Sequence, residues 1–178
     1  MIISDQQREE NFQEYLRLLQ DPNYTDVTFD EKSGGVSAVH LDHQFDKSIG
    51  PFGYKRGEYE LNSVAILRRR GHYIVLESEL SSGAVVCKNF DGYLDGSRVE
   101  IKTVESDGRW AVMTKIIKAK KQGAQMIILY FPQRELYSLR RVTQGLEDIS
   151  TSSREDYEGI RLLCIVEQDV VEIEKPSW

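Results

Sequence analysis

The apolar run at residues 124–131, AQMIILYF, most restricts the folds open to this chain. It lacks the strict alternation of a strand with one wet face, so it predicts a strand that is buried on both sides. A sheet that contains such a strand needs helices on both of its faces. Gly123 before the run and Pro132 after it mark the two ends of the strand.

The segments before this run predict the rest of a mixed sheet. Helical patterns span residues 58–70 and 110–122, and strand patterns span residues 72–79, 85–94 and 98–104. Residues 58–131 thus have the order helix, three strands, helix, strand. The second of these helices joins the third and fourth strands, which predicts a crossover connection. The expected fold class is α/β, an α+β arrangement around a mixed sheet.

Further elements are expected on either side of this core. Residues 4–20 predict an amphipathic helix with Phe12, Leu16 and Leu19 on its apolar face, followed by strands at 24–29 and 36–41. Residues 133–159 are polar and predicted to be irregular, with room for a short helix, and residues 160–166 and 170–174 predict an edge hairpin. We expect an N-terminal arm (1–50) packed on a core domain (51–178), or one domain over residues 1–178.

The charge of the chain is unevenly distributed around a net value of −6. Residues 1–31 hold 8 acidic and 2 basic side chains, residues 145–178 hold 9 and 3, and residues 32–144 hold 12 and 18. A basic centre between acidic ends is compatible with a polyanionic substrate, although ordinary surfaces also show such asymmetry. No apolar run reaches the ~18 residues of a membrane span, and the N-terminus has no secretory signal. Cys87 and Cys164 lie in apolar runs, so we expect buried thiols in a reducing compartment.

Residues 91–102, DGYLDGSRVEIK, predict a β-hairpin with a two-residue turn at Asp95-Gly96, a dipeptide that favours a type I′ turn. That register places Asp91 directly opposite Glu100, and side-chain alternation puts Lys102 on the same face. Two carboxylates so placed repel each other by roughly 4 kcal/mol at ~4 Å and an effective dielectric of ~20. A divalent cation between them would offset the repulsion, so this face is a candidate metal site.

Polar side chains on the two predicted core helices are further candidates. Glu60 lies along the edge of the apolar stripe of the helix at 58–70, and Lys115, Lys118 and Gln122 form a polar stripe on the helix at 110–122. Both features have ordinary alternatives. A carboxylate is favourable in the first turn of any helix, and most polar stripes are solvated faces.

The remaining candidates have ordinary alternatives too. Asp91 could be a residue at the edge of a turn, and Glu100 and Lys102 could be an exposed ion pair. His40 and His43 suggest a metal ligand set, but residues three apart on a strand point to opposite faces. Packing or hydrogen bonding is therefore the expected role of these histidines.

Taken together, the acidic and basic candidates resemble a known nuclease family. The pattern Glu60-x-Asn62 … Gly71-His72, then Asp91-Gly92-Tyr93-Leu94-x-Gly96, then Glu100-Ile101-Lys102 resembles the PD-(D/E)xK, or restriction-endonuclease-like, superfamily. It is similar to toxin nucleases of bacterial contact-dependent growth inhibition and related polymorphic systems, and to modules attached to phage minor-head proteins. The stretch GGVSAVHLDHQFD is similar to the segment that precedes some of those modules. Phe90 stands where the family motif has a proline.

The resemblance implies a role for each candidate. Asp91 and Glu100, with the carbonyl of Ile101, would bind Mg²⁺ or Mn²⁺, and Glu60 would complete the shell or orient a water ligand. Lys102 would orient the attacking water or stabilise the charge that develops at phosphorus. Neighbouring phosphates would be held by a set of side chains on the helix at 110–122: Lys115, Lys118, Lys121 and Gln122.

The implied function is metal-dependent hydrolysis of phosphodiester bonds, by a bacterial toxin that cleaves tRNA or DNA. Such a toxin acts in the cytoplasm, is delivered from another cell or associated with a phage, and has an immunity protein as a partner. The alternative is a non-catalytic docking or binding module of a phage or mobile element, which predicts no metal affinity and no effect of replacing Lys102. An immunity-type role is disfavoured, because such proteins need acidic binding faces.

Overall fold

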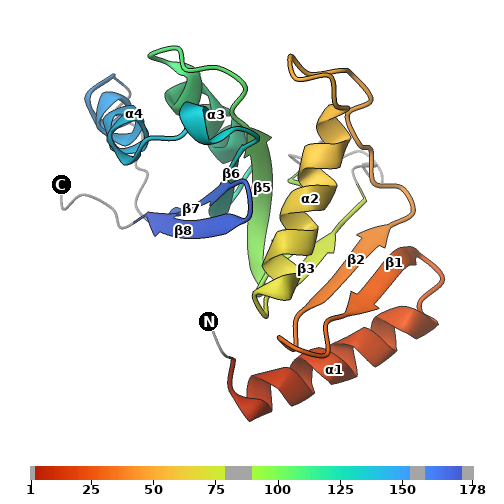
Figure 1. Cartoon of the computed structure of the whole chain (residues 1–178). Coiled ribbons are helices and arrows are strands. Elements are labelled where there is room, and N and C mark those ends of the chain that lie inside the picture. The colour runs from red at the N-terminus through yellow and green to blue at the C-terminus, as the bar shows by residue number, and fades with distance from the viewer. Residues whose placement is uncertain (1–2, 79–89, 153–158, 174–178) are drawn as a thin grey trace.

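A computed structural model describes residues 3–78, 90–152 and 159–173. Within these residues, eight strands form one mixed sheet in which they lie side by side in chain order (Figure 1). The helices are α1 (Asp5–Gln20), α2 (Arg56–Arg69), α3 (Ala111–Lys121) and α4 (Leu139–Ser152). The strands are β1 (Tyr24–Phe29), β2 (Val36–His40), β3 (Tyr73–Leu76), β4 (Gly92–Leu94), β5 (Ser97–Thr103), β6 (Met126–Phe131), β7 (Arg161–Val166) and β8 (Asp169–Ile173).

The expected core order is confirmed, because α2, the three strands β3 to β5, α3 and β6 follow one another along the chain. β5 and β6 are parallel and are joined through α3, as the predicted crossover requires. Every residue of β6 is buried, which agrees with its continuous apolar sequence. β7 lies parallel to β6, and β8 forms the edge of the sheet, so the predicted final hairpin is also present.

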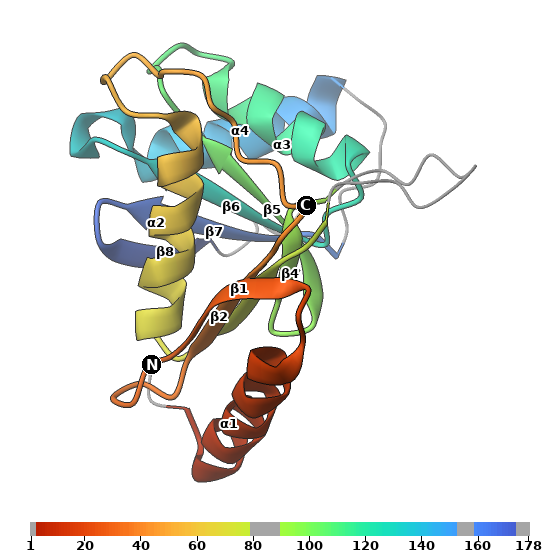
Figure 2. The ribbon, with the colours of Figure 1, turned by 90° about the vertical axis from the view of Figure 1, so that its right-hand side faces the viewer.

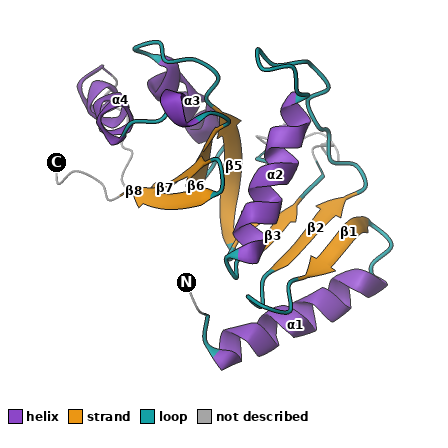
Figure 3. Cartoon of the chain, in the orientation of Figure 1, coloured by secondary structure: helices purple, strands orange, loops and turns teal. Residues whose placement is uncertain are grey.

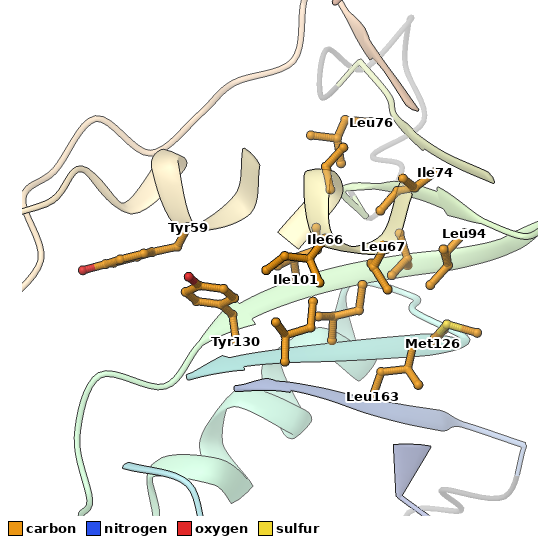
Figure 4. Close-up of a cluster of buried hydrophobic side chains, with 14 of the residues drawn as sticks. Tyr59, Ile66, Leu67, Ile74, Leu76, Leu94, Ile101, Met126, Tyr130 and Leu163 are labelled. Atoms are coloured by element: carbon orange, nitrogen blue, oxygen red, sulfur yellow. The ribbon is translucent and has the colours of Figure 1, made fainter. Parts of the chain in front are cut away.

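Helices cover both faces of this sheet, as Figures 2 and 3 show. On one face, α2 contributes Tyr59, Ile66 and Leu67 to a buried cluster that also contains Ile101 and Tyr130 (Figure 4). The rings of Tyr59 and Tyr130 stack with their centroids 5.5 Å apart. On the other face, α1 packs on the strands at the β1 edge, and α3 and α4 pack on β6 and β7. The middle of that second face is where the polar residues of β5 lie.

The β4–β5 hairpin has the predicted two-residue turn. Asp95 and Gly96 have φ values of 47° and 79°, as a type I′ turn requires, and Leu94 pairs with Ser97. The first strand is shorter than expected, however. It begins at Gly92, and Phe90 and Asp91 precede it, while residues 85–89 and the expected turn at 81–83 lie outside the described residues. The strand expected at 72–79 is likewise reduced to β3.

The predicted apolar face of α1 is wrong. Phe12, Leu16 and Leu19 are 37%, 36% and 52% exposed, and the buried residues of the helix are Asn11 and Leu18. The amide of Asn11 explains the rotation, because its Nδ2 donates to the carbonyl of Gly34 at 2.8 Å and also contacts that of Gly71 at 3.4 Å. A buried amide with two carbonyl partners fixes which side of the helix faces the sheet.

The segment that begins at residue 133 is more regular than expected, since α4 occupies Leu139–Ser152; residues 153–158 lie outside the described residues. Val142, Leu146 and Ile149 recur at helical spacing and are buried against the face that α3 also covers. Cys164 is a buried free thiol, as expected, and Cys87 lies outside the described residues. In the part of the chain that the structure describes, no helix is long and apolar enough to cross a membrane. The expected boundary near residue 50 stays a prediction, although β2 pairs directly with β3.

Candidate active site

The structure brings Asp91 and Glu100 together at the open end of the β4–β5 hairpin. The N–H of Asp91 donates to the Val99 carbonyl at 3.1 Å and to Oε2 of Glu100 at 3.2 Å. Oδ2 of Asp91 accepts a hydrogen bond from the N–H of Ile101 at 2.6 Å. Asp91 therefore adjoins Glu100, as the register predicted. It lies one residue before β4, and the contact is made by its main-chain N–H.

Glu100 is completely buried, so the alternative of an exposed Glu100–Lys102 pair is wrong. Val99 and Ile101 pack in the cluster under α2, and alternation along β5 sends Glu100 and Lys102 to the opposite face. There the Nζ of Lys102 forms an ion pair with Oε1 of Glu100. The pairing of β5 with β4 and β6 thus holds the Glu100 carboxyl in a buried position on the face of the sheet opposite α2.

Both carboxyl groups have perturbed acidities. Burial raises the pKa of Asp91 well above its usual value, and the charges of Glu100 and Glu60 raise it further. Burial also raises the pKa of Glu100, against the opposing effect of Lys102. Ionising all three carboxyl groups, Glu60, Asp91 and Glu100, would place more negative charge here than Lys102 balances. A cation is the group that would offset this excess.

Glu60 reaches this charge cluster from the first turns of α2. Its charge raises the pKa of both Asp91 and Glu100, which indicates that the three carboxylates share one region. Its side chain is 16% exposed, and Oε1 lies 2.7 Å from Nε2 of His43. Glu60 is therefore more than a favourably placed residue at the start of a helix, because a buried imidazole contacts it.

His43 is the residue of this site that sequence reasoning did not identify. Its side chain is fully buried, with Nδ1 2.8 Å from the carbonyl oxygen of Glu77 and Nε2 against Glu60. Because a carbonyl oxygen can only accept, Nδ1 carries the proton of that hydrogen bond. The main chain of Glu77 in turn donates its N–H to the carbonyl of Asp91 at 2.9 Å. His43 thereby links Glu60 to the segment beside Asp91.

The basic side chains of α3 approach the same region through its first half. Lys115 is half-buried; burial lowers its pKa, the charge of Glu105 opposes this, and the positive charges of Lys118 and Lys102 lower the pKa further. α3 packs against β5, the strand that carries Glu100 and Lys102. Lys121 and Gln122 lie further along the helix, and their role in binding nucleic acid stays a prediction.

The donor set suits a hard divalent cation. Asp91, Glu100 and the Ile101 carbonyl offer only oxygen ligands, and Mg²⁺ is usually held by one or two carboxylates with several waters. Among the residues that the structure describes, no group of three or more His, Cys, Asp and Glu side chains is arranged to hold a metal ion. The fit therefore rests on two carboxylates and their raised pKa values, with Mg²⁺ or Mn²⁺ as the expected ion.

Comparison with known proteins gives one distant likeness. No protein-family model and no curated protein matches the chain. Among solved structures, the chain is similar to one from the "CdiA-CT/CdiI toxin and immunity complex from Burkholderia pseudomallei". The TM-score is 0.50 and the identity 16%, over 79% of this chain and 99% of that one. At this identity the likeness concerns the fold, a mixed sheet flanked by helices.

Proposed function

We propose that this protein is a metal-dependent endonuclease of the PD-(D/E)xK type, which hydrolyses phosphodiester bonds of nucleic acid. The observation that carries the proposal is the buried Glu100 next to the half-buried Asp91, with Lys102 beside them. Carboxyl groups with raised pKa values that lie together with a lysine are typical of functional sites.

The residues of the site would divide the reaction among them. Mg²⁺ or Mn²⁺, when bound, would lower the pKa of a water ligand and shield the charge of the phosphate. Asp91 and Glu100 would bind that ion, and Glu60 would orient one of its waters through the fixed contact with His43. Lys102 would hold the attacking water or stabilise the charge developing at phosphorus. Lys115 and Lys118 would hold neighbouring phosphates.

The toxin role is part of the same proposal. The solved structure that this fold resembles belongs to a toxin and immunity complex, which contains two kinds of protein. A buried carboxylate site with a lysine suits the toxin, because an immunity protein has no need of one. We therefore infer a toxin nuclease that acts on RNA or DNA after delivery into a target cell, with an immunity protein as its partner.

A cleavage assay tests this function. Purified protein is incubated with total RNA and with plasmid DNA, each with Mg²⁺ and with a chelator. We expect cleavage of at least one substrate with Mg²⁺, none with the chelator, and none by Glu100→Gln. Glu58→Gln is the matched control, because Glu58 is an exposed carboxylate in the first turn of α2. No cleavage of either substrate would favour the docking module, and full cleavage by Glu100→Gln would refute the assigned site.

A further inference from the structure

A pocket opens at the start of α3, the helix that packs against β5 of the candidate active site. Its volume is about 380 Å³, and its walls come from the loop after β5 and the first turns of the helix. This volume falls in the range of small-molecule sites, roughly 300–1,000 Å³. The side chains that give the pocket its character are Glu105, Arg109, Trp110, Thr114 and Lys115.

Trp110 offers this pocket an open aromatic surface. Its side chain is large and apolar, yet the residue is 47% exposed. The guanidinium of Arg109 lies 4.4 Å from the centroid of its ring, which limits the motion of both side chains. An indole beside a stacked guanidinium is a surface on which a planar, electron-rich ring can stack, and nucleobases bind proteins in this way.

The charge of the pocket suits an anion next to that ring. Lys115 lines the pocket, and its helix α3 packs against β5, the strand that carries Lys102. The one acidic wall residue, Glu105, is neutralised by Arg56, whose Nη2 lies 2.8 Å from Oε2 of the carboxylate. Arg109 and Lys115 are then left to give the pocket a net positive charge.

We infer that this pocket binds one unpaired nucleotide of the substrate, with its base on Trp110 and its phosphate against Lys115. The inference rests on the proposed nuclease function and names the class of its substrate. A base inside a duplex is stacked on both sides and cannot reach a side chain. The preferred substrate is therefore single-stranded nucleic acid, or an unpaired loop or end of a folded one.

An acidic protein partner could also use an exposed tryptophan and arginine. Lys115 favours a nucleotide, because the pocket then offers a cation for a phosphate next to an aromatic ring for a base. Thr114, which also lines the pocket, adds a hydroxyl that suits a phosphate or a base edge.

Binding measured without metal tests the pocket separately from catalysis. The probes are fluorescein-labelled RNA and DNA strands of about ten nucleotides and the corresponding duplexes, titrated by anisotropy in chelator. We expect the single strands to bind more tightly than the duplexes, and Trp110→Ala to weaken their binding roughly tenfold. Trp110→Phe keeps a stacking ring and should stay within about twofold. The control is Leu139→Ala, which removes an apolar side chain of similar exposure, 55%, from α4.

The outcomes distinguish this inference from the nuclease proposal. Unchanged binding by Trp110→Ala, with the variant shown to be folded by its melting temperature, overturns the pocket and leaves that surface to a protein partner. Equal affinity for single strands and duplexes overturns the substrate class. Binding through Trp110 without cleavage in Mg²⁺ would keep the pocket and remove the nuclease function. Mg²⁺-dependent cleavage and strand binding that are both unchanged in Trp110→Ala would keep the nuclease function and remove the pocket.

Discussion

The two ends of the β4–β5 hairpin carry the same kinds of side chain in opposite settings. At the turn end, Asp95 accepts hydrogen bonds from the N–H of Tyr73 at 2.9 Å and from Nδ1 of His72 at 2.6 Å, and its side chain is 43% exposed. At the open end, Asp91 and Glu100 lie against each other, and Glu100 is fully buried. Asp95 is thus open to solvent, whereas Asp91 and Glu100 adjoin each other and have main-chain N–H groups and Lys102 as partners within the described residues.

This difference separates a structural carboxylate from a functional one. Asp95 ties the turn to β3, and its hydrogen bonds are complete without a ligand. At the open end, burial raises the pKa values of Asp91 and Glu100 and the charge of Glu60 raises them further, so the ionised carboxylates are costly to hold there without a counter-ion. Proteins accept such a cost mainly where a cation or a reaction makes use of it. Four comparisons between the two ends test this account.

The largest expected effect is on cleavage. Asp91→Asn keeps the shape of the side chain and removes a charged ligand, so we expect the rate of Mg²⁺-dependent cleavage to fall on the order of a hundred- to a thousandfold. Asp95→Asn at the turn end should leave the rate within about twofold. Single-turnover cleavage assays of the two variants provide the measurement. Similar losses in both variants would mean that the activity depends only on the integrity of the hairpin.

The two glycines of the hairpin should differ strongly in their effect on stability. A Cβ on Gly92 would overlap the carbonyl oxygen of Val75 in β3, so Gly92→Ala forces the strands apart and should cost about 3 kcal/mol or more. A Cβ on Gly96 would meet no other described atom within 4 Å, so Gly96→Ala carries only the strain of a positive φ, roughly 1 kcal/mol. Urea unfolding compares them. A smaller loss for Gly92→Ala than for Gly96→Ala would contradict the close β3–β4 approach.

The two histidine–carboxylate pairs should differ in their effect on activity. His43→Gln removes the imidazole that orients Glu60, and we expect a 10- to 100-fold loss of cleavage with a weaker response to Mn²⁺, as for groups that orient metal ligands. His72→Gln removes the partner of Asp95 and should leave the rate within about twofold. Rates measured over a range of Mn²⁺ concentrations separate the two. A normal Mn²⁺ dependence in His43→Gln would leave that residue a purely structural role.

The smallest effects concern the stability of the metal-free protein, and their signs should be opposite. Asp91→Asn removes a repelling carboxylate and should raise the free energy of unfolding by roughly 1 kcal/mol at neutral pH. Asp95→Asn weakens the contact with His72 and should lower it by a similar amount. The measurement is urea unfolding in chelator.

The effect of Asp91→Asn should also depend on pH. Because the pKa of Asp91 is raised in the folded state, the native protein binds more protons than the unfolded chain, and stability falls as the pH rises through that interval. The gain from Asp91→Asn should therefore disappear below about pH 4, where the carboxyl is protonated in both states. A gain that persists there would point to packing instead of charge.

The parts of the site that sequence predicts are those set by local rules. Asp95-Gly96 dictates a two-residue turn, and the turn fixes the register that brings Asp91 beside Glu100. Alternation along β5 then puts Lys102 on the same face as Glu100. The buried strand β6 was equally clear, because its sequence is apolar throughout.

The parts that sequence missed depend on contacts between distant segments. His43 was noted for its spacing from His40, but its partner Glu60 lies on the next helix, and spacing rules cannot identify such a pair. The orientation of α1 was missed because the Asn11 amide, bonded to Gly34 and Gly71, outweighs the pattern of its apolar residues.

A calorimetric titration with Mn²⁺ shows directly whether the open end of the hairpin is a metal site. We expect a saturable binding signal for the unaltered protein and for Asp95→Asn, and loss of that signal in Asp91→Asn and Glu100→Gln. The absence of binding to the unaltered protein, or equal binding by all four proteins, would contradict a metal site there.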